Sequence, residues 1–506
     1  MDELRTRLQA LHSIAEKIIS LSGSTGASLG VLHNGEIKLT ENFGFQDHSR
    51  RQRATSDTLY NIGSLTKSMV AQAAGSGLDE SLVAWNTPVS SLIPEFHNVD
   101  RAITEQCSLV DLLSHRTGLP TANVLWYQGG SKSLVNKKDL LPLVNAMSPT
   151  FSFRSSWRYS NWGYSLAAAV LERVTGQPWQ MIVKKRLWDP LEMKHTTTEA
   201  MWKSLPNAAQ GFMALEDAST FAVDAQAIDD SSIMGPAGGV CSNVNELFIY
   251  YCALLEAYKH RNEDNSHSIS GSPFKHVPTV FSAHSVLPYP TVPAYNDTTY
   301  GFGWARGYVP GALGIISDNS GMVQSMPIIG RGALPQQLRH RVGELCDSAD
   351  WLAQMYLDSL LGSPNINDFI RLTEECIQVT RSRFSEAEET LSKERVSGTV
   401  LKPLEQYCGR YYWESRFYFI DVCFDGEDLQ LIIQGREDQS YKLKHYHYDT
   451  FTWLMAHDEE AKRGRFIQST YTYKIVFSCD EHHNIVSFTW QDIGGGKALL
   501  RKENYQ

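Results

Sequence analysis

The sequence predicts an α+β protein in which an antiparallel sheet flanked by helices, with a long helical insertion, is followed by a small antiparallel β-sheet or barrel. Two runs rich in β-forming residues flank Asn34-Gly35, which is a strong short-range signal for a hairpin. Residues 62–260 have a largely helical pattern, and short alternating runs recur from Leu404 to Lys502. Because 506 residues exceed one ordinary core, we expect two globular units.

The N-terminal segment predicts one amphipathic helix. Its apolar residues Leu4, Leu8, Leu11, Ile14 and Ile18 recur at helical intervals. Charged residues occur throughout this segment, whereas a secretory signal needs an uninterrupted apolar stretch. We therefore expect no export signal and a cytoplasmic protein.

The rest of the chain divides by pattern. The expected units are a catalytic domain over 1–362, a charged helical linker over 363–395 and a β-rich domain over 396–506. Helices are expected at 64–75, 108–115, 162–175 and 244–256, and the polar, Pro-rich segment 262–298 predicts a long loop or lid. In the last unit, strands are expected at 416–424, 428–435, 440–448, 451–456, 471–478 and 484–491.

Composition excludes several functional classes. A formal net charge of −10 without a Lys/Arg cluster argues against nucleic acid as a partner. No apolar run reaches the roughly 20 residues that a membrane-spanning helix needs. The eight cysteines form no CxxC pair and no Cys/His pattern typical of zinc, so we expect reduced thiols, no metal site and no cofactor. The sequence does not decide whether the protein forms a homo-oligomer.

Ser64 and Lys67 are the first candidate catalytic pair. Residues three apart at the start of a helix lie on one face, so their side chains can touch. A serine hydroxyl becomes a nucleophile when a neighbour takes its proton, and a helix N-terminus stabilises a developing oxyanion. A lysine, with an ordinary pKa near 10.4, needs burial or a nearby cation to act as the base. Alone, this pattern also fits a capped helix with a surface lysine.

A second motif supplies the help that Lys67 needs. Tyr159 could lie against Lys67 and pass a proton between Ser64 and a leaving group. Asn161 would point the same way and bind a substrate carbonyl or Lys67. Alone, Tyr159-Ser160-Asn161 also fits a helix N-cap beside a packed aromatic residue. The two motifs together favour catalysis.

Five segments in order resemble the β-lactamase-related serine hydrolase family, which includes class C β-lactamases, penicillin-binding-protein-like peptidases, esterases and fungal acyltransferases. They are SLTK at 64–67, DLLSHRTGLP at 111–120, RYSNWGYSLAAAVLERVTGQPW at 158–179, DPLEMKHT at 189–196 and GPAGGVCSNVNEL at 235–247. The first of them has the SxxK pattern of penicillin-recognising serine enzymes. The tail is also similar to the β-rich domain of some fungal relatives, through Tyr407–Tyr412 and Asp449–Trp453.

The resemblance implies a β-lactamase/transpeptidase-like domain in which Ser64 is acylated, Lys67 and Tyr159 pass its proton, and Asn161 binds substrate. It implies a structural role for His115, which we expect to be buried and hydrogen-bonded. Trp162 and Trp304, with Trp126, Tyr127 and Trp157, predict an aromatic-lined pocket for a lipophilic small molecule. The expected reaction forms an acyl-serine from an ester, thioester or amide and passes the acyl group to water or another acceptor, in fungal secondary metabolism by analogy.

The third motif of such enzymes, Lys or His-x-Gly on a strand, is not found in the sequence. After Trp304 the chain passes abruptly to ADWLAQMYLDSLL, so we expect roughly thirty residues to be missing between Gln337 and Asp347, judged from how such sheets close. His340 has the wrong spacing for this motif. Two alternatives follow: a catalytically impaired protein that binds a ligand through the old cleft, and the product of a mis-spliced gene.

Overall fold

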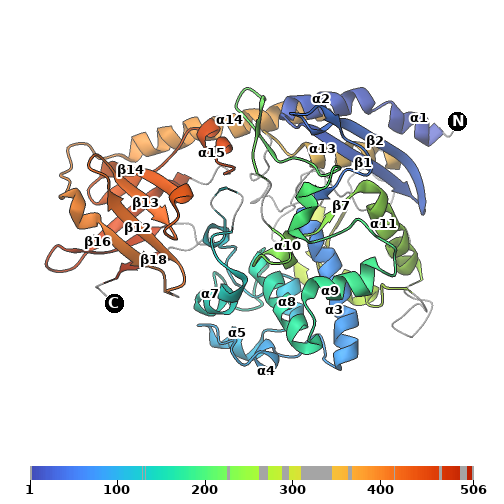
Figure 1. Cartoon of the computed structure of the whole chain (residues 1–506), viewed down its shortest axis with the longest axis horizontal. Helices are drawn as coiled ribbons and strands as arrows, with labels where there is room; N and C mark the ends of the chain where they lie inside the picture. Colours follow the sequence, from blue (N-terminus) through green and yellow to red (C-terminus); the bar gives the residue numbers. More distant parts are fainter. Residues whose placement is uncertain are drawn as a thin grey trace.

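The computed structural model describes residues 3–127, 129–130, 133–224, 228–260, 272–287, 296–308, 345–362, 367–414, 416–465, 470–490 and 498–503. Two bodies are visible in Figure 1: a helix-and-sheet body that contains the N-terminus, and a β-barrel that contains the C-terminal part of the chain. In the described part of the chain, no helix is long and apolar enough to cross a membrane.

The expected N-terminal hairpin is confirmed. Strands β1 (Gly26–His33) and β2 (Glu36–Asp47) pair antiparallel, and β3 (Gln52–Arg53) pairs with β2. Asn34 and Gly35 both have positive φ, 53° and 80°, as a two-residue hairpin turn requires.

The single N-terminal helix expected from the sequence is wrong. The segment forms two helices, α1 (Glu3–Gln9) and α2 (His12–Ser22), although no Gly or Pro marks the break between them. Leu8 and Ile18 are nevertheless both buried in the same apolar cluster as Val31 of β1 and Leu352 of the later helix α13 (Ser348–Leu361). Tertiary packing therefore sets the break, while the apolar spacing is retained.

The central part of the chain is helical, as expected. The four predicted helices are found. Among the described residues here, the α-helices and short strands are α3 (Thr66–Ser81), α4 (Val89–Leu92), α5 (Arg101–Gln106), α6 (Leu109–Leu113), α7 (Leu140–Ala146), α8 (Asn161–Thr175), α9 (Trp179–Val183), α10 (Gly235–Gly238), α11 (Val244–Lys259), β4 (Tyr60–Asn61), β5 (Phe212–Ala214), β6 (Thr220–Ala222) and β7 (Cys241–Ser242). Helices α3 and α8 are buried along most of their length and pack together at the centre of this body. Strand β4 pairs with β7 and so brings the segment before α3 beside the segment after α10.

Segment 262–298 was expected to be a loop or lid, and its described part is instead built into the fold. It contains α12 (Val277–Phe281), β8 (Ser285–Val286) and the first residues of β9 (Asn296–Tyr300); residues 261–271 and 288–295 lie outside the described residues. Phe274, Val277 and Val280 are buried, so a few apolar residues in a polar and Pro-rich stretch are enough to anchor it. Strands β8, β9 and β10 (Ala305–Tyr308) form a separate sheet in the order β10-β9-β8.

Helix α14 (Phe369–Glu394) runs from one body to the other (Figure 1). Its Phe369 packs in the N-terminal apolar cluster, and Leu391 accepts a hydrogen bond at its carbonyl from the barrel residue Tyr446. The proposed unit boundaries at 362 and 395 stay predictions.

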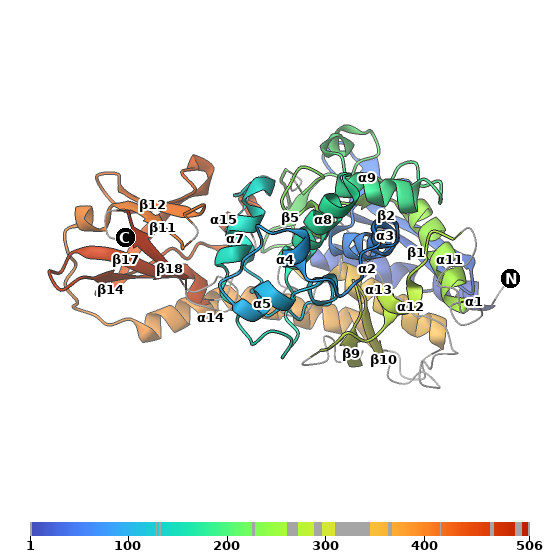
Figure 2. The same cartoon turned by 90° about the horizontal axis from the view of Figure 1, so that it is seen from below.

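The C-terminal unit is a closed eight-stranded antiparallel barrel, which decides between the sheet and the barrel left open by the sequence. Its strands and short helix are β11 (Gly409–Tyr412), β12 (Phe419–Phe424), β13 (Leu429–Ile433), β14 (Ser440–His447), β15 (Thr450–Thr452), β16 (Lys474–Cys479), β17 (Ile485–Trp490), β18 (Ala498–Lys502) and α15 (His457–Lys462). Pairing of β11 with β18 closes it. Leu429, Leu431 and Ile433 alternate inward along β13, as a half-buried strand requires. Figure 2 shows α7 and α15 where the two bodies meet.

Candidate active site

Ser64 lies in a 3-10 turn, Gly63–Leu65, that leads directly into α3. Gly63 has a φ of 51°, a conformation that glycine adopts at low cost. Asn61 supports the turn from both sides: its Oδ1 accepts from the Gly63 N–H at 3.0 Å, and its Nδ2 donates to the Gly238 carbonyl at 3.1 Å. The turn is therefore anchored to α10.

Lys67 follows one helical turn later and is 1% exposed. Its Nζ lies 3.0 Å from Ser64 Oγ, 2.8 Å from Asn161 Oδ1 and 2.7 Å from the Ala237 carbonyl oxygen. Burial lowers the pKa of Lys67 well below its ordinary value. In a neutral amine, two N–H groups can donate to Asn161 and Ala237, which leaves the nitrogen lone pair for the Ser64 hydroxyl proton.

Two aromatic rings oppose this effect. Lys67 Nζ lies 4.8 Å from the centroid of the Tyr159 ring and 5.3 Å from that of Tyr164. Such contacts favour an ammonium group by about 0.5 to 2 kcal/mol. Burying the charge costs several kcal/mol when the hydrogen-bond acceptors are neutral, as those of Lys67 are among the described residues. The neutral amine is therefore favoured.

Tyr159 is the second side chain that contacts the Ser64 hydroxyl. Its hydroxyl lies 2.6 Å from Ser64 Oγ, and burial raises the pKa of Tyr159 above its ordinary value despite this hydrogen bond. The phenol is thus protonated at neutral pH and donates to Ser64 Oγ. Its backbone is held by Thr121, whose Oγ1 donates to the Tyr159 carbonyl at 2.8 Å.

His115 is buried and hydrogen-bonded, as expected. Its Nδ1 accepts from the Ser160 N–H at 3.2 Å, and its ring centroid lies 4.6 Å from that of Tyr159. Burial, with a contribution from Lys67, lowers the pKa of His115 well below its ordinary value, so the ring is neutral. Its carbonyl also accepts from the Arg158 N–H at 2.8 Å. His115 therefore holds the turn on which Tyr159 lies.

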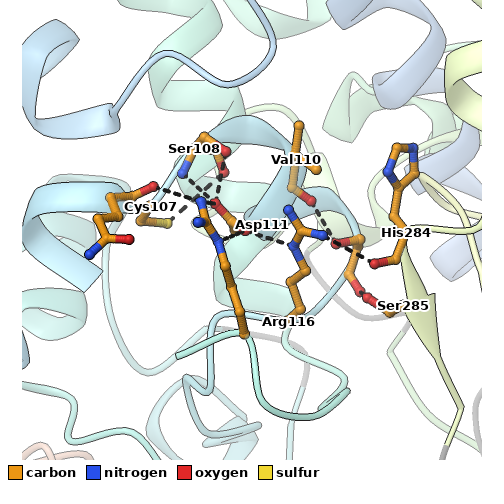
Figure 3. Close-up of polar contacts among 10 residues, drawn as sticks. Cys107, Ser108, Val110, Asp111, Arg116, His284 and Ser285 are labelled. Atoms are coloured by element: carbon orange, nitrogen blue, oxygen red, sulfur yellow. Dashed lines mark hydrogen bonds and ion pairs between the residues drawn. The ribbon is translucent and has the colours of Figure 1, made fainter. Parts of the chain in front are cut away.

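A buried carboxylate, that of Asp111, supports the segment around His115. Asp111 accepts from Arg116 Nε at 2.7 Å and from the Ser108 N–H and hydroxyl at 2.9 and 2.8 Å (Figure 3). Arg154 adds two more bonds to Asp111, at 2.8 and 2.9 Å. Arg116 also donates to the His284 carbonyl at 3.2 Å, which joins the cluster to the segment before β8 (Figure 3).

The Asp111 carboxylate is held in its charged form. Burial favours a higher pKa for Asp111, but the hydrogen bonds from Arg154, Ser108 and Arg116 outweigh it, so the pKa is lowered. The Arg154 N–H donates to the Arg116 carbonyl at 2.9 Å. The cluster thus joins the backbone on either side of His115 to the segment that leads to Tyr159.

The structure brings together four of the six predicted site residues: Ser64, Lys67, Tyr159 and Asn161. Trp162 is 0% exposed and donates through Nε1 to the Thr121 carbonyl at 3.2 Å. One residue beyond Asn161, it points about 100° away around the helix.

Trp304 also packs in the interior. Its ring lies 4.6 Å from that of Phe281 on α12. The proposed role of Trp162 and Trp304 in binding substrate stays a prediction.

Asn123 and the Ala237 carbonyl were not identified from the sequence. Asn123 Oδ1 accepts from Asn161 Nδ2 at 3.1 Å, so it lies one hydrogen bond behind the Lys67 contact. An asparagine alone among apolar residues in the run ANVLWY, 122–127, was the available signal. Nothing in the sequence could identify the carbonyl, because every residue has one.

The region expected to carry the third motif lies outside the described residues, which exclude 309–344. This region includes His340 and most of the predicted gap between Gln337 and Asp347. Within the ranges that the structure describes, no group of three or more His, Cys, Asp or Glu side chains could hold a metal ion.

Comparison with known proteins gives two family matches. The model of the family Beta-lactamase matches residues 14–331, and that of DUF3471, a domain of unknown function, matches residues 393–501. The chain is 23% identical over 475 residues to "Unguisins hydrolase ungD" of Aspergillus violaceofuscus, covering 85% of this chain and 80% of the relative. It is 23% identical over 273 residues to "Putative penicillin-binding protein PbpX" of Bacillus subtilis, covering 53% and 66%.

A solved structure has a similar fold along the whole chain. It is described as the octameric penicillin-binding protein homologue from Pyrococcus abyssi, with a TM-score of 0.54 and 17% identity over 99% of this chain and 100% of that chain.

Proposed function

The chain belongs to the Beta-lactamase family, and we propose that it is a serine hydrolase that forms an acyl intermediate on Ser64. The observation that carries the proposal is the contact of Ser64 Oγ with both a buried amine and a buried phenol, at 3.0 and 2.6 Å. A serine that only caps a helix needs neither partner.

In acylation, Ser64 Oγ attacks the carbonyl carbon of the substrate while its proton passes to the lone pair of Lys67. Negative charge develops on the carbonyl oxygen near the start of α3, where the helix dipole stabilises it. Tyr159 then donates its phenolic proton to the leaving group and recovers a proton from Lys67 through the hydrogen-bonded cluster. The bond between the carbonyl carbon and the leaving group breaks, and the ester to Ser64 remains.

In deacylation, water attacks the acyl carbon and its proton passes to the Lys67–Tyr159 pair. The bond to Ser64 Oγ breaks, Ser64 regains its proton, and a carboxylic acid leaves. An alcohol or amine in place of water would give acyl transfer by the same steps.

We propose an ester, thioester or amide of a lipophilic small molecule as the substrate. The support is the aromatic character of the surroundings, since Trp157, Tyr300 and His115 lie in ring contact with Tyr159 or with one another. The relative named as a hydrolase of unguisins comes from Aspergillus violaceofuscus, and the proposal of a fungal metabolite as substrate rests on the likeness to this relative.

The test uses a short-chain nitrophenyl ester for turnover and a fluorophosphonate for labelling, with intact mass and peptide mapping. Wild type is expected to turn over the ester and to gain the probe mass at Ser64, and Ser64→Ala is expected to lose both. Ser68→Ala is the matched control, because Ser68 is a buried serine of the same helix whose hydroxyl donates to the Leu65 carbonyl. Equal turnover in Ser64→Ala and wild type would show that Ser64 is not the nucleophile.

The alternative is a catalytically impaired binding protein, which the absence of a third motif from the sequence favours. A folded wild-type protein that neither turns over the ester nor reacts with the probe would support this alternative.

A further inference from the structure

The orientation of the Asn161 carboxamide decides which atom faces Lys67. A carboxamide has one edge that accepts and one that donates hydrogen bonds. Here Oδ1 accepts from Lys67 Nζ at 2.8 Å, and Nδ2 donates to Asn123 Oδ1 at 3.1 Å. A flipped amide would place N–H groups against Lys67 and an oxygen against an oxygen, so both hydrogen bonds would be lost.

Trp126 selects between these two orientations. An indole N–H can only donate, and Trp126 Nε1 donates to Asn123 Oδ1 at 3.0 Å. This contact keeps the Asn123 oxygen turned toward Asn161, whose Nδ2 must then face Asn123. Asn123 Oδ1 thus accepts from both Trp126 Nε1 and Asn161 Nδ2, which leaves Asn161 Oδ1 to accept from Lys67.

These residues lie on or against a segment that we call the docking loop, residues 122–127, 129–130 and 133–135, which contacts the barrel. The Tyr127 hydroxyl donates to the Gly464 carbonyl, and the Gly130 N–H donates to the Arg463 carbonyl at 2.7 Å. Gln439 Nε2 donates to the Gly129 carbonyl at 3.0 Å. Two consecutive barrel residues and a barrel glutamine therefore hold the docking loop.

Two further barrel side chains reach the same loop. Arg436 Nη1 donates to the Ser133 carbonyl at 3.0 Å, and the Tyr418 hydroxyl donates to the Val124 carbonyl at 3.4 Å. Val124 directly follows Asn123, so the barrel contacts reach within one residue of the amide that orients Asn161.

The barrel side of this contact is held by a buried ion pair. Arg465 Nε lies 2.7 Å from Glu460 Oε2, with side chains 1% and 2% exposed. The Arg465 guanidinium also lies 4.6 Å from the ring centroids of both Tyr441 and Trp453. Gly129 packs so closely on this arginine that a Cβ there would lie 2.4 Å from Arg465 Cγ. Movement of the 463–465 turn would therefore displace the docking loop.

We propose that Asn123, Trp126 and Tyr127 are positioning residues for the reaction at Ser64, and that the C-terminal barrel sets the orientation of the Asn161 amide through them. The inference rests on the proposed function. It assigns the barrel a role in the catalytic unit rather than only in stability or association.

Lys67 is the group whose titration reports this orientation. The titratable side chains around it are Tyr159 and Tyr164, whose rings face Lys67, Tyr300, which interacts with both of them, and His115. Burial raises the pKa values of the three phenols and lowers that of His115. All four are neutral near pH 7, and α10 contributes only the Ala237 carbonyl to the Lys67 contacts. A change in the pH dependence of acylation therefore reports on Lys67.

The first test compares Trp126→Phe and Asn123→Asp in the full-length protein. Trp126→Phe keeps an aromatic ring but removes the N–H, so we expect acylation of Ser64 by the nitrophenyl ester to slow by about 10- to 100-fold, mainly in kcat. Without the Trp126 N–H the Asn161 amide can turn, and Lys67 then loses the Asn161 oxygen that stabilises its ammonium form. The pKa of Lys67 should therefore fall, which moves the rising part of the pH profile to lower pH. Asn123→Asp keeps both accepted hydrogen bonds but adds a negative charge, so the same part should move to higher pH.

Trp179→Phe is the matched control for the ring truncation. Trp179 is fully buried, and its Nε1 has no hydrogen-bond partner among the described residues. Trp179→Phe should therefore leave the pH profile of acylation unchanged. Equal profiles for wild type, Trp126→Phe and Asn123→Asp would overturn the proposal.

The second test addresses the barrel. Tyr127→Phe should slow acylation in the same direction as Trp126→Phe, because it removes the bond to Gly464. Tyr446→Phe is the control, since it removes another buried bond between a barrel tyrosine and a carbonyl, that of Leu391, away from the docking loop. Urea unfolding checks that both variants lose similar stability. If both slow acylation equally, the barrel acts only through stability and the proposal fails.

A direct measurement of the Lys67 pKa separates this proposal from the proposed function. In full-length protein carrying labelled lysine, the Lys67 NMR signal is assigned by its loss in Lys67→Met. If wild type is inert but Asn123→Asp raises and Trp126→Phe lowers the Lys67 pKa, the proposed function fails, while the control of the Asn161 amide by Asn123 and Trp126 stands. If wild type is acylated but neither variant changes the Lys67 pKa, the positioning role fails and the proposed function stands.

Discussion

Lys67→Met removes the proposed base while keeping an unbranched side chain of similar length in the same space. Loss of a general base costs about 10²- to 10⁴-fold in rate, or about 3 to 5 kcal/mol in the activation barrier. We expect a loss of this size in the acylation of Ser64, because the amine nitrogen lies 3.0 Å from the hydroxyl whose proton it takes.

The same change should alter the pH dependence of stability. Burial holds the pKa of folded Lys67 well below the ordinary value of 10.5. Between these two values the unfolded chain binds one more proton than the folded chain, so the contribution of Lys67 to the free energy of unfolding rises with pH. The slope reaches about 1.4 kcal/mol per pH unit, and Lys67→Met should remove it.

The assay combines stopped-flow acylation by a nitrophenyl ester with urea unfolding at about pH 6, 7.5 and 9. Over this range the free energy of unfolding of wild type should rise more steeply with pH than that of Lys67→Met. Lys203→Met is the control, because burial also lowers the pKa of Lys203. It should change the slope of stability without slowing acylation. Retention of acylation within about threefold in Lys67→Met, well below the expected loss of a base, would refute the role of Lys67.

The remaining predictions concern the phenol, the carboxylate cluster and the packing of α8. Tyr159→Phe should lower the acylation rate by about 10²- to 10⁴-fold, with Tyr250→Phe, another buried phenol, as the control; equal rates in both would contradict the proton transfer. Asp111→Asn should lower the free energy of unfolding toward the lower end of about 3 to 5 kcal/mol, because its arginine partners are part-exposed. The wild-type contribution is present above pH 3.8 and is lost as pH falls through the lowered pKa, so a difference that persists unchanged in acid urea titrations would be inconsistent with it. Gly163→Ala should destabilise by about 1 to 3 kcal/mol because its Cβ would lie 2.7 Å from the Leu112 carbonyl oxygen, whereas Gly77→Ala on α3, with its nearest contact at 3.5 Å, should be neutral or stabilising by up to about 1 kcal/mol; calorimetry that ranks them in reverse would disprove this packing.

The Asp111 cluster and the docking loop support the two ends of the same turn region. Asp111 holds the backbone around His115, which orients the turn before α8, while the docking loop holds Asn123 against the first residue of α8. The first support lies within the helical body and the second depends on the barrel. Asp111→Asn should therefore lower stability more than it changes the Lys67 pKa, and Trp126→Phe should do the opposite.

Local patterns in the sequence determined several features of this protein. Asn34-Gly35 predicted its hairpin because few residues adopt positive φ at two consecutive positions. The spacing of Ser64 and Lys67 predicted their contact because residues three apart on a helix are neighbours. The alternating runs predicted strands of the C-terminal unit because the side-chain period of a strand is two.

Only the tertiary structure decided the features that depend on distant segments. Ser64 and Tyr159, which are in contact, lie 95 residues apart in the sequence. The barrel closes by pairing of its first strand, β11, with its last strand, β18. The sequence alone did not identify Asn123, whose Oδ1 accepts from Asn161 Nδ2. Helical and strand periods specify which face of an element is apolar, but which element covers that face, and which polar group meets Lys67 there, is decided by packing among all the segments at once.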